Sequence, residues 1–189
     1  MNMKEDIIVL VAEQEELKLV KKLKDLGVCP YLFDNPTIVV TGVGALNVIK
    51  TIKMLNLSPN TRIVNVGYGG SKNLKPNFYE ISMCKLYHPN VDYPEPTYYG
   101  LYSLDWWTYE SIFDSVTCYS GSDFVLKTEK EDVIFDMELA YICAMLSNTD
   151  IPITAIKYVS DNLDLQQYRN QLKNEEEIKN EEIYEEETP

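Results

Sequence analysis

Short apolar runs alternate along this chain with stretches in which apolar residues recur at helical spacing. Residues 7–11 form a continuous run of apolar, largely β-branched residues, which is typical of a strand covered on both faces. Over residues 15–26 apolar side chains recur between lysines, and Gly27 follows directly. This pattern predicts an amphipathic helix that ends at the glycine.

The alternation continues to about residue 159. The pattern predicts strands over residues 37–41, 62–66, 81–86, 116–119 and 153–159, and helices over residues 45–57 and 137–146. Thr41-Gly42-Val43-Gly44 and Asn65-Val66-Gly67-Tyr68-Gly69-Gly70 each close an apolar run with glycines. We therefore expect two strands to end there, in loops whose backbone can closely approach a ligand.

The order of these elements predicts an α/β fold: a single domain with three α/β/α layers and a mixed, twisted central sheet. The chain has 189 residues, of which 45% are hydrophobic, so it can bury one core but is short for two domains. We place the domain at residues 1–163. A short helix and an acidic tail, either solvated or disordered, follow over residues 164–189.

Charge narrows the choice of partners. The net charge is −13, and much of it lies in residues 174–187, which are mostly glutamate. Clustered lysines and arginines, which phosphate backbones require, are not evident, so a nucleic acid is not an expected partner.

The cysteines and apolar runs bear on location. Cys29, Cys84, Cys118 and Cys143 show no paired spacing, and we interpret them as reduced core residues. Residues 1–6 lack a basic region that leads into a cleavable apolar segment, and no apolar run approaches the roughly 20 residues of a bilayer span. We expect a cytoplasmic protein without a membrane partner. No metal-ligand spacing is present, and we expect no metal and no cofactor.

Two polar motifs follow apolar runs and are candidates for chemistry: Phe135-Asp136-Met137-Glu138 and Val159-Ser160-Asp161-Asn162. Burying a carboxylate is costly unless the protein uses it. Asp161 stands at the carboxyl end of a predicted strand, the usual edge for ligand sites in open α/β sheets. Structural alternatives exist for both motifs, because Ser-Asp can cap a helix and Glu138 can complement a helix dipole.

These two motifs and the two glycine segments, in this order over residues 7–162, resemble the nucleoside phosphorylase and nucleosidase superfamily. The closest resemblance is to its methylthioadenosine/S-adenosylhomocysteine nucleosidases. It implies a nucleoside phosphorylase-like fold and an enzyme that hydrolyses the N-glycosidic bond of a purine nucleoside. The implied substrate is a small-molecule nucleoside, such as a 5′-substituted adenosine, from which the free base is released.

The resemblance also implies roles for individual residues. Asp161 would protonate the purine as general acid, with Ser160 orienting it. Glu16 would hold and activate the attacking water as general base. Glu138 would accept hydrogen bonds from the ribose hydroxyls, with Met137 packed against the ribose.

The remaining candidates would bind the substrate. Phe124, in Ser120-Gly121-Ser122-Asp123-Phe124, would stack on the base, although the acid of this loop stands one position later than in the family. Gly44, Tyr68 and Gly69 would bring the backbone of the glycine segments close to the ligand. As a structural alternative, Phe124 and Met137 can be ordinary core residues.

The nucleophile can be water or phosphate. Phosphorolytic relatives hold a phosphate dianion with an arginine and a serine at the positions of Asn65 and Tyr68, and the chain therefore favours hydrolysis. A phosphate-dependent phosphorylase and a nucleoside-binding or sensing protein with weakened turnover remain the alternatives.

An aromatic segment between residues 88 and 107 predicts an interface. Tyr98, Tyr99 and Tyr102 would either line the 5′-substituent pocket of a neighbouring subunit or contact it elsewhere. We expect a homodimer as the homo-oligomeric state.

Overall fold

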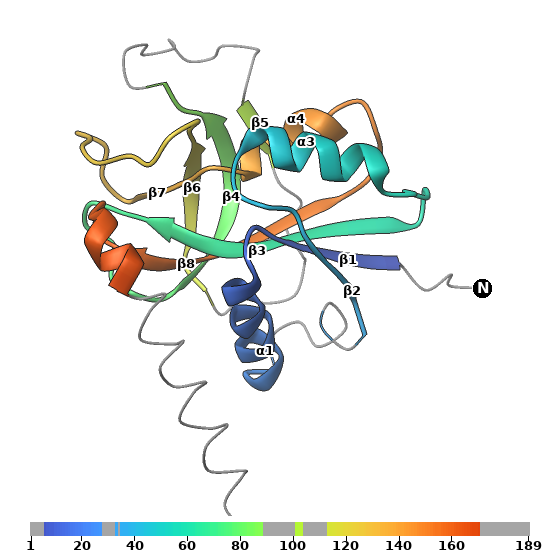
Figure 1. Ribbon diagram of the computed structural model, residues 1–189, viewed down its shortest axis with the longest axis horizontal. Helices are drawn as coiled ribbons and strands as arrows, with labels where there is room; N and C mark the ends of the chain where they lie inside the picture. The colour runs from blue at the N-terminus through green and yellow to red at the C-terminus, as the bar shows by residue number, and fades with distance from the viewer. Residues whose placement is uncertain (1–5, 28–32, 34, 89–100, 104–112, 171–189) are drawn as a thin grey trace, which may run out of the picture.

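Helices and strands alternate in the computed structural model, which describes residues 6–27, 33, 35–88, 101–103 and 113–170 (Figure 1). The strands are β1 (Asp6–Val11), β2 (Thr37–Val40), β3 (Thr61–Gly70), β4 (Phe78–Leu86), β5 (Leu101–Ser103), β6 (Ser115–Ser120), β7 (Val133–Asp136) and β8 (Ile153–Asp161). The helices are the short 3-10 helix η1 (Gln14–Glu16), α1 (Leu17–Asp25), α3 (Ala45–Met54) and α4 (Leu139–Leu146). Residues 165–170 are also helical.

The strands form one mixed sheet. Its main path runs β2-β1-β3-β7-β6-β4-β5, and β8 pairs with both β3 and β4. Because β3 also pairs with β7, the strands β3, β8, β4, β6 and β7 close into a ring. β1 and β8 lie parallel to β3 on either side of it, so these three strands end at the same edge.

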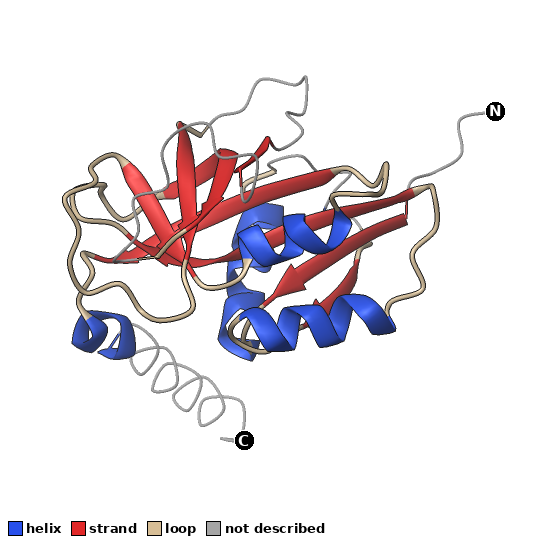
Figure 2. Cartoon of the chain, turned by 90° about the horizontal axis from the view of Figure 1, so that it is seen from above, coloured by secondary structure: helices blue, strands red, loops and turns tan. Residues whose placement is uncertain are grey.

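Two helical layers cover the β1–β3 half of the sheet. On one face, Val9 and Val11 pack with Leu19 and Leu23 of α1. On the other face, Leu10 packs with the apolar sides of α3 and α4. Figure 2 shows these helices beside the strands, with the helix at residues 165–170 set apart from them. The predicted single α/β domain with a mixed central sheet is confirmed, and the ring adds to that prediction.

Most predicted elements are present within a few residues of their expected ends. The short strands β5 and β7 were not predicted. The expectation for the second glycine segment was wrong, because β3 continues through Gly67 and Gly69 to Gly70 instead of ending in a loop. Gly69 and Gly70 remain in register with Val159 and Asp161 of β8, across an irregularity between them.

Several expectations concern residues outside the described part of the chain: the acidic tail beyond residue 170, most of the aromatic segment, and Cys29. Cys84, Cys118 and Cys143 are buried and free, as predicted. Within the described residues, no helix combines the length and apolar character needed to span a membrane.

Gly69 tests how tightly β3 packs against β7. A Cβ at this position would collide with Ile134 Cγ2 and lie 2.9 Å from the Phe135 carbonyl oxygen. We expect Gly69→Ala to lower the free energy of unfolding by about 2–3 kcal/mol, measured by chemical denaturation. The control is Gly27→Ala, where φ is +66° but no atom lies within 4 Å; its cost is about 1 kcal/mol. Equal losses in both variants would contradict the packing argument.

Candidate functional site

The carboxyl ends of four strands surround a cavity of about 290 Å³. Residues that follow β1 and β7 line it, together with the last residues of β3 and β8. Among the predicted site residues, those on its walls are Glu16, Tyr68, Gly69, Phe124, Met137, Glu138, Ser160 and Asp161. The structure therefore brings the three predicted carboxylates to one cavity, although they are far apart in the sequence.

Glu16 is held by the main chain. It ends the 3-10 helix that follows β1, and its side chain is 4% exposed. Its Oε2 accepts hydrogen bonds from the backbone N–H groups of Ala12 (2.5 Å) and Glu13 (3.2 Å), and its Oε1 accepts one from Tyr68 (2.8 Å). Burial raises the pKa of Glu16, while Lys157 and the three backbone donors oppose that rise.

Glu138 connects two segments at the cavity. Its Oε1 accepts a hydrogen bond from the backbone N–H of Gly44 at 2.7 Å, and its Oε2 accepts one from Met137 at 3.2 Å. Glu138 precedes α4 but does not cap it with its side chain. Burial, and secondarily the charge of Asp136, raises the pKa of Glu138 to about 7.

Gly44 was predicted to bring its backbone close to the ligand, but the structure places it behind Glu138. It is not among the residues that line the cavity, and its N–H donates to Glu138. Its φ of +86° is in the left-handed region, which glycine adopts without strain. The glycine segment after β2 thus positions a carboxylate, and its neighbour Val43 is the residue on the wall.

Asp161 ends β8 with its carboxylate anchored locally. Ser160 Oγ donates to Oδ2 at 2.8 Å, and the backbone N–H of Leu163 donates to Oδ1 at 2.9 Å. Burial raises the pKa of Asp161, against the effect of these hydrogen bonds. The helix at residues 165–170 receives its side-chain cap from Asp164, which accepts from the N–H groups of Gln166 and Gln167. The capping interpretation of Asp161 is therefore wrong.

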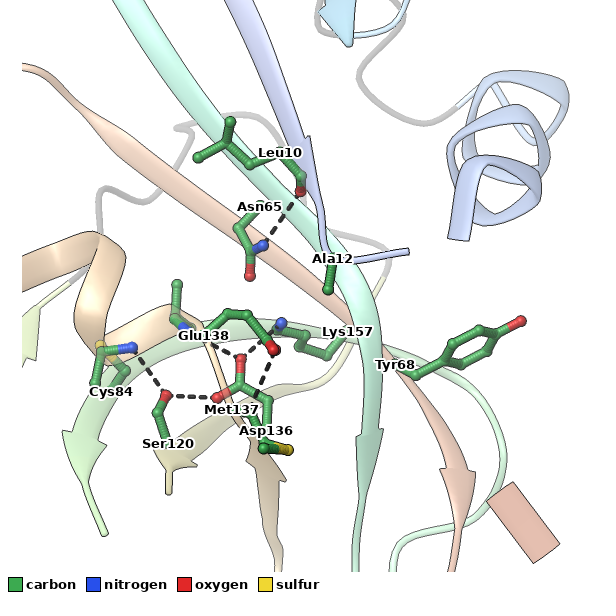
Figure 3. A network of polar contacts seen from close by, with 12 residues as sticks. Leu10, Ala12, Asn65, Tyr68, Cys84, Ser120, Asp136, Met137, Glu138 and Lys157 are labelled. Carbon is green, nitrogen blue, oxygen red and sulfur yellow. Dashed lines mark hydrogen bonds and ion pairs between the residues drawn. The ribbon is translucent and has the colours of Figure 1, made fainter. Parts of the chain in front are cut away.

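A buried ion pair adjoins the carboxylates, and its acid, Asp136, lines the same cavity. Lys157, on β8, is 1% exposed, and its Nζ lies 2.7 Å from Asp136 Oδ2. Asp136 also accepts hydrogen bonds from Ser120 Oγ and the backbone N–H of Leu139. Figure 3 shows the side chains of Asp136, Glu138 and Lys157 pointing toward one another. Burial opposes the charged form of Lys157, yet the facing acids together hold its pKa above the usual value.

Glycines in β3 leave room for two of the carboxylates. A Cβ on Gly67 would lie 2.8 Å from Glu16 Oε1 and 3.3 Å from Lys157 Nζ. A Cβ on Gly70 would lie 2.7 Å from Asp161 Oδ1. These glycines therefore admit acidic side chains from neighbouring segments.

Aromatic residues form another part of the wall. Phe124 is half-buried, and its ring centroid is 5.9 Å from that of Tyr168. The Tyr168 hydroxyl donates to Glu13 Oε2 at 2.7 Å. Tyr68 is 6% exposed, and its ring packs edge-on against Tyr158 and Tyr168, so most of this side chain belongs to the core.

Sequence reasoning assigned no role to several residues of the site. Asp136 lies in the Phe135-Asp136-Met137-Glu138 motif, and Glu13 lies three residues before Glu16. Tyr168 belongs to a short apolar stripe with Leu165 and Leu172, a pattern typical of packing. Lys157 offered a clear signal, since a lysine inside an apolar strand needs a partner. Among the described residues, no group of three or more His, Cys, Asp or Glu side chains could hold a metal ion.

The sequence matches no protein-family model and no curated protein. Solved structures, however, match the fold over most of the chain. Futalosine hydrolase of Helicobacter pylori strain 26695 has a TM-score of 0.66 at 18% identity, covering 92% of this chain and 93% of that one.

Two nucleosidase structures match equally well. S-adenosylhomocysteine nucleosidase from Streptococcus pyogenes, in complex with 5-methylthiotubericidin, has a TM-score of 0.67 at 15% identity and covers 91% of this chain and 92% of that one. The 5′-methylthioadenosine/S-adenosylhomocysteine nucleosidase from Neisseria meningitidis, in complex with methylthio-immucillin-A, has a TM-score of 0.66 at 18% identity, with 90% and 93% covered. The chain thus has the same fold as these hydrolase and nucleosidase structures, which confirms the nucleoside phosphorylase-like fold that the resemblance implied.

The ion pair beside the site can be tested by removing its cation. Lys157→Met leaves Asp136 buried without a counter-ion, and we expect a loss of about 3–5 kcal/mol in the free energy of unfolding. Lys72→Met is the control, because Lys72 pairs with Glu131 at 3.1 Å on the surface and should cost less than about 1 kcal/mol. The double variant Lys157→Met, Asp136→Leu should recover part of the loss. Similar losses for both lysines would contradict the argument.

The raised pKa of Glu138 predicts a pH dependence of stability. Between its ordinary pKa of 4.5 and its folded value of about 7, the folded state binds more protons than the unfolded state. Stability therefore falls as pH rises through this window, by about 3 kcal/mol for this group. Denaturation at pH 4.5 and pH 8 should show a fall that Glu138→Gln reduces and the exposed control Glu129→Gln does not. An unchanged fall in Glu138→Gln would contradict the assignment.

Proposed function

We propose that this protein is an enzyme that hydrolyses the N-glycosidic bond of a purine nucleoside, with a 5′-substituted adenosine as the substrate class. The observation that carries the proposal is the meeting of Glu16, Glu138 and Asp161 on the wall of one cavity of about 290 Å³. That volume is close to the lower end of the range for small-molecule sites, about 300–1,000 Å³. The three carboxylates arrive from separate segments and are all buried.

Each carboxylate suits a different step. Raised by burial, the pKa of Asp161 favours a protonated acid that can donate to the leaving base. Three backbone donors hold Glu16 in one orientation, which suits a base that positions a water molecule. Glu138 uses one backbone hydrogen bond on each oxygen and keeps acceptor capacity for ribose hydroxyls.

The charge of the cavity suits the reaction. Glycosidic cleavage builds positive charge on the ribose, and preorganised carboxylates stabilise it as it develops. No lysine, arginine or histidine is among the described residues on the cavity wall. Lys157, which does not line the cavity, is paired with Asp136.

The same feature favours water over phosphate as the nucleophile. A phosphate dianion needs cationic or bidentate donors, and the described wall offers only acids and neutral groups. The similar structures are described as a hydrolase and nucleosidases, which supports this choice. That the base is a purine and that the ribose carries a 5′ substituent are inferred from the sequence resemblance.

We also propose a cytoplasmic homodimer whose interface includes the aromatic segment between residues 88 and 107. The aromatic composition of that segment supports the proposal.

The assay is release of free base from 5′-methylthioadenosine, S-adenosylhomocysteine and adenosine in phosphate-free buffer. We expect turnover by the wild type and losses of about 100-fold or more in kcat for Asp161→Asn and Glu16→Gln, with thermal unfolding checked in parallel. Glu15→Gln is the matched control, since Glu15 is not on the cavity wall.

Other outcomes would select the alternatives. Turnover that requires added phosphate would identify a phosphorylase. Tight nucleoside binding without product, unchanged by Asp161→Asn, would identify a binding or sensing protein.

A further inference from the structure

The turn that follows β8 contains a backbone conformation that its residue type disfavours. Leu163 has a φ of +68°, in the left-handed region, and among the described non-glycine residues only Asp132 also has a positive φ, of +53°. A side chain in this region crowds its own backbone, whereas glycine adopts the conformation freely. Such strain persists where neighbouring contacts impose it, and it is common at functional sites.

The backbone of this turn holds the carboxylate of Asp161. The N–H of Leu163 donates to Asp161 Oδ1 at 2.9 Å, and the backbone of Asp164 also interacts with the carboxylate. Successive N–H groups that converge on one anion are typical of turns with a left-handed residue. The carbonyl oxygen of Asp161 accepts from the N–H of Ser71 at 3.0 Å, which fixes the start of the turn to the chain beyond β3.

The side chain of Leu163 covers the same carboxylate. It is buried, and it lines the cavity together with Asp161. Leu163 Cδ2 and Asp161 Oδ1 both lie within 3.0 Å of the point where a Cβ on Gly70 would stand, so the methyl group and the carboxylate oxygen are close neighbours. An apolar group in this place keeps water from the carboxylate and favours its uncharged form.

Leu163 therefore acts on Asp161 in two ways. Its N–H stabilises the charged form and fixes the orientation of the carboxylate, while its side chain favours the protonated form. Burial is the stronger influence, because the pKa of Asp161 is raised overall. The other titratable groups near this acid are Asp164 on its own turn and, on the described cavity wall, Glu13, Glu16, Asp123, Asp136, Glu138 and Tyr168.

We propose that Leu163 is a positioning residue for the general acid. Its left-handed backbone holds the Asp161 carboxylate in one orientation, and its side chain shields that carboxylate so that it carries the proton for the leaving base. This inference rests on the proposed function, which gives Asp161 the role of proton donor.

The proton on Asp161 can be followed without turnover. Protein labelled with 13C-aspartate gives a carboxyl signal that Asp161→Asn identifies, and the dependence of its chemical shift on pH reports the pKa. We expect Leu163→Ala to lower the pKa of Asp161 toward its ordinary value, because water then reaches the carboxylate. Leu163→Met keeps an apolar side chain of similar size and should preserve the pKa. Leu165→Ala is the matched control, since it removes another leucine from the same wall.

The hydrolysis assay gives a second readout. A general acid must be protonated, so kcat/KM falls as pH rises through its pKa. Leu163→Ala should move this alkaline limb to lower pH and reduce kcat/KM at pH 7.5 by about threefold or more. Leu163→Met should restore both. A leucine with only a structural role would lower thermal stability and leave the alkaline limb in place.

Glycine at position 163 tests the strained backbone. Leu163→Gly loses the same side chain as Leu163→Ala but adopts the left-handed conformation without strain. It should therefore unfold at a higher temperature than Leu163→Ala, which reverses the order found at ordinary positions. It should also lower the pKa of Asp161, so it carries the carboxyl titration if Leu163→Ala does not fold.

Three results would overturn the inference: a pKa of Asp161 that Leu163→Ala and Leu163→Gly leave unchanged, an equal fall in Leu165→Ala, or a Leu163→Ala variant at least as stable as Leu163→Gly. The proposed function fails separately. If no nucleoside releases its base with the wild type, hydrolysis is overturned, while the carboxyl titration still decides whether Leu163 controls the protonation of Asp161.

Discussion

The arrangement of acids at this site depends on the buried ammonium of Lys157. Asp136, Glu138 and Glu16 meet at the carboxyl edge of the sheet, where burial disfavours every one of their charges. Lys157 lies among them and forms its ion pair with Asp136. Because Lys157 neutralises the charge of Asp136, which lines the same cavity, Glu16 and Glu138 can face the cavity at a tolerable electrostatic cost.

The closed part of the sheet explains how distant segments share a cavity. β3 pairs with β8 along most of its length and touches β7 at its last residue, Gly70. The acids at the ends of β7 and β8 are therefore brought to the same place by backbone pairing. The register of the strands therefore determines where the acids lie, and each acid is on or beside a helix or strand.

Much of the fold could be predicted from the sequence, because β-branched runs and helical spacing are local signals. β7 escaped prediction because the whole strand has only four residues, and β5 because it has three. The glycines of β3 were misjudged for a physical reason. Glycine is expected where a strand ends, but here three glycines stay in the strand because acidic side chains or neighbouring strands occupy the space of their side chains.

For Glu138 and Asp161, sequence motifs pointed to residues that the structure places on the cavity wall. Hydrogen bonds between residues far apart in the sequence could not be predicted, such as the one that Tyr168 donates to Glu13 across 155 positions. Lys157 was partly predictable. Its position inside an apolar strand indicated burial, but the sequence did not identify Asp136 as its partner.

Main-chain anchoring gives Glu16 an unusual kind of robustness. Its three hydrogen bonds come from the N–H groups of residues 12, 13 and 68, which every amino acid except proline supplies. Substitutions at those positions leave the backbone donors in place. The carboxylate of Glu16 can therefore keep its orientation while the surrounding sequence diverges.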